Sequence, residues 1–226
     1  MTDIRAFVQQ QGRANGADAA YAATMQNRGG QLEINSIEGM YSAWLRAGKV
    51  FEAHFATEGG TSTIEANATY DATEPWFRMT CPSSKILVPV KVKVTPTTVW
   101  ATTDMIVLSV SDTDTYTSGG AAPDVRNLAA VSSLDSELGT TAMTSVFDGD
   151  SALTEAAMTD QRIIDITVFR TGGLFLPYEY NILKGDPMVM IHGTASFVAN
   201  AMLAGAFEAN YSVVWAELDK SELVNA

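Results

Sequence analysis

The chain has 226 residues, of which 46% are apolar and 18% are charged, and its 14 basic and 26 acidic residues give a formal net charge of −12. This composition is typical of a folded globular protein and excludes an intrinsically disordered one, which is poorer in apolar residues. The acidic balance argues against nucleic-acid binding through bulk charge, because that binding needs Lys and Arg to neutralise phosphates.

The chain shows neither a membrane helix nor a secretion signal. It has no run of 18 apolar residues, and its first residues lack the basic start and apolar centre of a signal peptide. Cys81 is the single cysteine, so no internal disulfide can form. We therefore expect the protein to assemble inside a cell.

Residues 1–30 differ in composition from the rest. They are rich in Ala, Gln, Asn and Gly and nearly free of β-branched residues, and we interpret them as an N-terminal arm, with a disordered terminus as the alternative. Asp3 could cap a short helix that extends to Gln11. Three arginines stand against two aspartates here, so this is not a basic nucleic-acid arm.

Residues 36–47 have the pattern of a short amphipathic helix. Ser36 is a plausible cap, Gly48 a natural terminator, and apolar residues recur at three- and four-residue spacing between them. A strand followed by a turn is the alternative, which periodicity alone does not exclude.

Strand signals begin at Lys49. Residues 50–56 and 61–70 favour strands, and residues 97–111 form a second long β run after the strongest signal, at 86–94. There, Ile86 and the even-numbered valines as far as Val94 are predicted to share one face, with Lys91 and Lys93 on the other. Pro89 removes a backbone donor and predicts an edge strand or a bulge.

Turn residues dominate 111–123, and residues 124–160 are weakly patterned, so we expect short strands or a helix there. The last third is β again, at residues 162–169, 174–183, 187–198 and 201–218. About eight β segments with one or two short helices predict an all-β fold, a closed sandwich of residues 31–226.

No catalytic or metal-binding pattern emerges. His54 and His192 are far apart and belong to no H-x-H or H-E-x-x-H motif. Asp112 and Asp114 resemble the start of a calcium loop, but Thr117 stands where an EF-hand needs glycine, and a plain acidic turn is the better interpretation. We expect no catalytic residues, no cofactor and no metal site.

The four tryptophans are candidates for either a sugar-binding surface or the core. In a β sandwich we expect them to be core or interface residues. They are Trp44, Trp76, Trp100 and Trp215.

Two stretches carry a resemblance to a known family. The first comprises residues 47–54, 68–70 and 86–92, and the second residues 186–193 and 211–218. In this pattern the chain resembles single jelly-roll capsid proteins of bacteriophages and environmental viruses. The resemblance implies an eight-stranded jelly roll of two antiparallel sheets with an N-terminal arm, present in many copies per particle and without enzymatic activity.

The resemblance also implies partners and a location. The partners would be copies of the chain itself, other virion proteins or an internal membrane layer, and the location would be a virion assembled in the host cytoplasm. Two alternatives remain open: a trimeric spike or glycan-binding receptor module, and an enzyme that acts on polysaccharide from a β-sandwich scaffold.

Overall fold

In the computed structural model the described residues are 37–55, 62–64, 69–97, 101, 104–120, 123–129, 135–138, 143–145, 154–156, 160–169, 176–203 and 207–221. The predicted arm, residues 1–30, and Trp100 lie outside these ranges. The chain divides into two compact units, Met1–Ala43 and Trp44–Ala226. All the strands belong to the second unit.

The predicted helix is confirmed as α3 (Ile37–Arg46). It ends because Gly48, at φ 69°, takes the left-handed conformation that glycine adopts without a steric penalty. The Gly48 N–H then donates to the Leu45 carbonyl and the Lys49 N–H to the Trp44 carbonyl, which is a Schellman cap. The alternative of a strand followed by a turn at these residues is therefore wrong.

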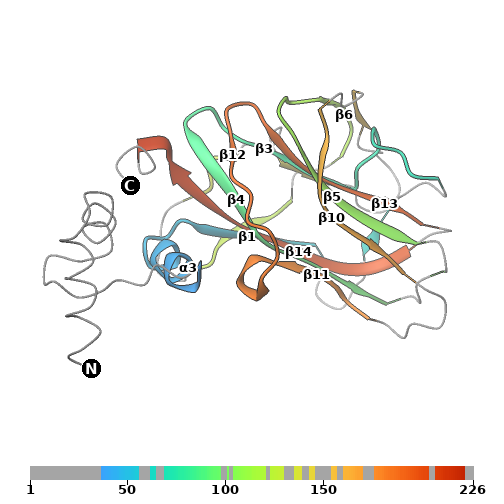
Figure 1. Ribbon diagram of the computed structural model, residues 1–226, viewed down its shortest axis with the longest axis horizontal. Helices are drawn as coiled ribbons and strands as arrows, with labels where there is room; N and C mark the ends of the chain where they lie inside the picture. The colour runs from blue at the N-terminus through green and yellow to red at the C-terminus, as the bar shows by residue number, and fades with distance from the viewer. Residues whose placement is uncertain are drawn as a thin grey trace, which may run out of the picture. The chain divides into compact units, whose positions relative to one another are not determined.

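Strands account for most of the regular structure, so the all-β prediction is confirmed (Figure 1). They are β1 (Val50–Phe55), β2 (Ser62–Ile64), β3 (Phe77–Thr80), β4 (Lys85–Pro96), β5 (Met105–Ser111), β6 (Tyr116–Ser118), β7 (Val125–Asn127), β8 (Met143–Ser145), β9 (Thr154–Glu155), β10 (Arg162–Val168), β11 (Tyr178–Asn181), β12 (Ile191–His192), β13 (Ser196–Met202) and β14 (Phe207–Asp219). A 3₁₀ turn, η1 (Ile182–Lys184), follows β11.

Two antiparallel sheets form the sandwich. One has the order β11-β4-β14-β1-β7, with β12 also paired to β4 and β2 to β14, and the other has the order β10-β5-β13-β3-β8. The short strands β6 and β9 pair with each other. Within residues 124–160 the described strands β7, β8 and β9 are all short, as predicted for this weakly patterned stretch.

Aromatic rings fill the space between the two sheets. Trp76 and Tyr211 meet edge to face at 4.7 Å between ring centroids, and Phe77 and Phe197 meet similarly at 6.4 Å. Trp215 stacks on Phe51 within the first sheet. These rings are buried, and their contacts identify the inner face of each sheet.

A bulge in β4 corrects the predicted apolar face. Trp215 pairs with Pro89 whereas Val214 pairs with Lys91, so Val90 is an extra residue in β4. Val92 stays on the inner face opposite Val213, but before the bulge the inner face passes to the odd-numbered residues. The single face predicted for Ile86, Val88, Val90, Val92 and Val94 is therefore wrong: Ile86 and Val88 lie on the outer face.

Pro89 does mark a bulge, as one of the two predicted alternatives had it. It does not mark an edge strand, because β4 lies inside its sheet between β14 and β11. On the β11 side, β11 pairs with residues 91–94 and β12 with residues 86 and 87. Residues 88–90 thus fall in a gap of that ladder, where a missing backbone donor costs little.

Three predicted strand boundaries are also wrong. In the run predicted over residues 97–111, the described residues Thr97, Ala101 and Asp104 are not in a strand, the Asp104 N–H closes a turn on the Ala101 carbonyl, and β5 covers Met105–Ser111. Of the strand predicted over residues 174–183, the described part from residue 176 is a strand only in β11, and residues 182 and 183 belong to η1. The last two strands divide after Met202, so the break predicted between residues 198 and 201 lies inside β13.

Candidate functional site

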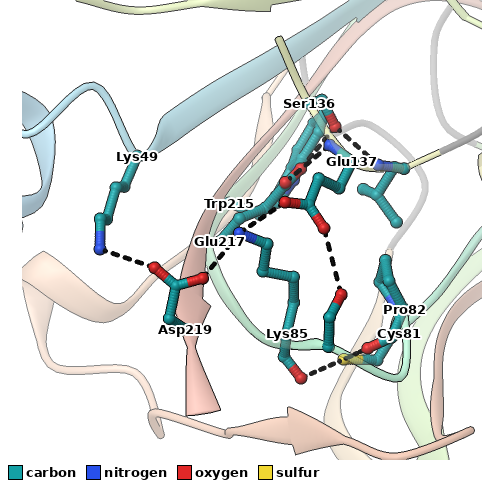
Figure 2. A network of polar contacts seen from close by, with 11 residues as sticks. Lys49, Cys81, Pro82, Lys85, Ser136, Glu137, Trp215, Glu217 and Asp219 are labelled. Carbon is teal, nitrogen blue, oxygen red and sulfur yellow. Dashed lines mark hydrogen bonds and ion pairs between the residues drawn. The ribbon is translucent and has the colours of Figure 1, made fainter. Parts of the chain in front are cut away.

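The densest group of polar contacts in the described residues surrounds Glu217 near the end of β14 (Figure 2). Glu217 is only 4% exposed. Its carboxylate accepts hydrogen bonds from the Trp215 Nε1–H at 3.0 Å, from the Glu137 backbone N–H at 2.9 Å and from the Ser136 hydroxyl. A buried carboxylate is stable only with such donors, and the two bonds from Ser136 and Glu137 hold residues 135–138 against β14.

Lys85 links the same loop to two strands. Its ammonium group lies 2.7 Å from Oε1 of Glu137 and 2.8 Å from Oδ1 of Asp219, and Lys49 reaches the other oxygen of Asp219 at 3.4 Å. Figure 2 shows the Lys85 side chain between the two carboxylates. The start of β4, the end of β14, the residue before β1 and the loop are thereby tied together.

Hydrogen bonds shift the pKa values of Lys85, Glu137 and Asp219 away from neutral pH. Hydrogen bonds from Lys85 lower the pKa of Glu137 and of Asp219, and bonds to these carboxylates raise the pKa of Lys85 well above its usual value. At neutral pH the lysine stays charged and both acids stay ionised. A general acid or base would need a pKa near the working pH, so these three groups stabilise the structure instead.

Cys81 lies beside the network, and its thiol contacts backbone carbonyl groups. Its Sγ donates to the Lys85 carbonyl at 3.2 Å and to the Pro82 carbonyl at 3.4 Å. Burial raises the pKa of Cys81 to about 11, so the group is a thiol and not a thiolate at neutral pH. Since the thiolate is the nucleophile and metal ligand, Cys81 is here a packing residue.

The two aspartates of the calcium-like motif form ion pairs with different arginines. Asp114 pairs with the fully buried Arg78, whose guanidinium group lies 4.7 Å from the Tyr116 ring centroid, and Asp112 pairs with Arg162. Each carboxylate already faces a cation, which disfavours a shared calcium ion. In the described ranges no three His, Cys, Asp or Glu side chains gather as a metal site would require.

The two histidines are not brought together. Both are exposed, His54 on β1 and His192 on β12, and β4 and β14 lie between these strands in the sheet. His192 borders a cavity of about 570 Å³ that the sequence did not predict, because four separate segments build it. Its lining residues are Val110, Ser111, Asp112, Arg162, Ile164, Val189, Met190, Ile191, His192 and Ala195.

The core interpretation of the tryptophans holds for two of them. Trp76 and Trp215 are completely buried, so neither can stack on a sugar at the surface. Trp44 is partly exposed at the end of α3.

Among the strands whose side chains are described, β10, at the edge of the second sheet, exposes the most large apolar residues. Ile163 is 56% exposed, Ile166 53% and Val168 60%. Strict alternation along residues 162–169 would put Ile163 on the face opposite to that of Ile166 and Val168. A bulge at Ile164 instead brings all three to the outer face, because they pair with alternate β5 residues, Ser109, Val107 and Met105.

No helix in the described ranges is long and apolar enough to cross a membrane. No protein-family model, curated protein or solved structure matches this chain. The geometry of the described residues is therefore the ground on which a function is proposed.

Proposed function

We propose that this chain is a non-enzymatic, self-assembling shell subunit of a virion, built on a jelly roll. The observation that carries the proposal is the strand order. Within the described ranges, eight strands have four or more residues: β1, β3, β4, β5, β10, β11, β13 and β14. Numbered one to eight along the chain, they give sheets of order 6-3-8-1 and 5-4-7-2.

This order supports the jelly-roll assignment because of its pairing rule. In a jelly roll of two Greek keys the first strand neighbours the eighth, the second the seventh, the third the sixth and the fourth the fifth. Here β1 pairs with β14, β3 with β13, β4 with β11 and β5 with β10. The shorter strands lie at sheet edges and in the connections.

A jelly roll alone does not define a function, since capsid proteins, lectins and enzymes share it. Two further features favour the shell. In the network around Lys85 and Glu217 (the Lys85–Glu217 network), Lys85 pairs with Glu137 and Asp219, and the buried Glu217 carboxylate is satisfied by hydrogen bonds, which suits a rigid building block. The apolar surface of β10 is left to solvent at a sheet edge, which suits contact with another protein.

The glycan-binding alternative draws less support. Trp76 and Trp215 lie in the core, which removes two of the four tryptophans that were candidates for a sugar-binding surface. The spike reading remains an outcome of the experiment below.

The test is the native mass of the full chain by light scattering, across a wide range of concentration and at low and high salt. Large particles or capsomer-sized oligomers are expected, and electron microscopy should then show closed shells or their fragments. Salt should favour assembly, because it screens the repulsion between subunits of net charge −12. A monomer under all conditions would overturn the proposal, and a stable trimer that grows no further would replace the shell with a spike.

A further inference from the structure

We propose that β10 pairs antiparallel with β10 of a second copy of the chain, so that the five-stranded sheet continues across two subunits. This inference rests on the proposed function and names one of the contacts that assembly would use. It begins from the position of β10, which pairs with β5 on one side and, among the described residues, with no strand on the other.

An exposed apolar edge strand is a template for another strand. Its backbone N–H and C=O groups on the free side can form a ladder, and side chains on alternate positions select the partner. Monomeric proteins protect such edges with charges, prolines or bulges. In β10 the single bulge lies at Ile164, which leaves Asp165–Val168 as a regular stretch, apolar on its outer face.

A second β10 fits this stretch. Pairing about a two-fold axis at Thr167 places Ile166 of each copy opposite Val168 of the other, and opposed residues share a face. The outer face of the joint then holds four apolar side chains that are exposed in the single chain. The inner face holds the two threonines opposite each other, a favourable cross-strand pair.

Charge also favours a second copy at this place. Two acidic subunits repel each other over most approaches, but β10 carries one arginine and one aspartate and is locally neutral. The pairing separates the two Asp165 residues by four positions along the ladder, roughly 13 Å. Each Asp165 carboxylate already accepts a hydrogen bond from the Tyr178 hydroxyl of its own chain, so no like charges meet at the joint.

The first test is Ile166→Lys in the full chain, measured by sedimentation alongside the wild type. Residue 166 is half exposed, so the variant should fold normally, and its thermal unfolding midpoint checks this. Two lysines at the joint should weaken association at least roughly tenfold. Leu176→Lys, at a residue 62% exposed and outside β10, is the control and should associate as the wild type does.

The second test is cross-linking, which does not depend on a charged substitution. In the proposed register residue 166 faces residue 168 of the other copy, at a Cα separation of roughly 4.5–5.5 Å, which lies within the range that a disulfide spans. A mixture of Ile166→Cys and Val168→Cys chains should oxidise to a covalent dimer faster than either variant alone, whose cysteines would be diagonal neighbours. Cys81 is buried and does not interfere.

The outcomes separate this inference from the shell proposal. If the wild type assembles, and Ile166→Lys assembles equally well without preferential cross-linking in the mixture, the β10 contact is wrong and the shell proposal stands. If the wild type never associates and the mixture does not cross-link, both are wrong. Cross-linking confined to the mixture, together with loss of association in Ile166→Lys, supports the contact and its register.

Discussion

The Lys85–Glu217 network and the β10 edge differ in whether their side chains find partners within the chain. In the network, ammonium, carboxylate, hydroxyl and indole groups are joined to one another within one chain, and Glu217 is nearly sealed from water. At β10, apolar side chains remain in water along an edge that is unpaired among the described residues. The difference suggests that the first region stabilises the subunit and that the second is reserved for contact.

The largest effect should come from the core on which both regions depend. Val92 is completely buried on the inner face of β4, so Val92→Asp places a carboxylate there without a partner. We expect a loss of about 5 kcal/mol or more, enough to unfold most of the protein.

Far-UV circular dichroism and solubility would measure that loss. Lys93→Asp, at a partly exposed residue on the opposite face of β4, is the matched control and should fold. A soluble, folded Val92→Asp variant would mean that the inner face has been assigned wrongly.

The next effect concerns the network itself. Glu217→Ala removes the acceptor for three donors, of which the Trp215 indole lies deepest in the protein. Leaving such donors without an acceptor should cost about 3 kcal/mol, visible as a lower urea midpoint. Asp124→Ala, which removes half of an exposed ion pair with Arg126, should cost almost nothing. If Glu217→Ala and Asp124→Ala lost equal stability, the network would stabilise the protein no more than an exposed ion pair does.

A smaller effect, dependent on pH, is expected for Lys85→Met. The lowered pKa values of Asp219 and Glu137 contribute stability that is present above their ordinary values, near 4, and lost as the pH falls through the folded values. The raised pKa of Lys85 contributes stability that is present below its ordinary value, near 10, and lost only at still higher pH.

The wild type should therefore exceed Lys85→Met by about 1 kcal/mol from roughly pH 5 to pH 10, since both carboxylates are about half exposed and solvent weakens the pairs. Below about pH 4 the gap should shrink. Denaturant titrations at several pH values would measure it. Lys184→Met, which breaks a more exposed pair with Glu179, is the control with the smaller gap. A gap that widened in acid would contradict the assigned charge states.

How much of this could be predicted depended on how local each feature is. The helix end at Gly48 followed from one glycine and its neighbours, and strands at β1, β4 and β10 followed from local alternation. The face of the sheet on which each residue of β4 and β10 lies did not follow from local alternation, because a bulge is defined by the partner strand. Val90 is an extra residue only relative to β14, and Ile164 is one only relative to β5.

The network was beyond sequence reasoning for the same reason. Lys85 and Asp219 lie 134 residues apart, and an acidic chain offers many carboxylates with equal claim to any lysine. The exposure of β10 was hidden as well, because an edge strand with an apolar outer face has the same alternation as a covered one.

The most direct test of the account is a comparison of stability and association in three chains: wild type, Ile166→Lys and Lys85→Met. Thermal unfolding and sedimentation of the same samples would measure both properties. We predict that Ile166→Lys keeps the stability of the wild type and loses association, while Lys85→Met loses stability and, below its unfolding temperature, keeps association. If Ile166→Lys were destabilised and still associated as the wild type does, the division between a stabilising network and a contact edge would be contradicted.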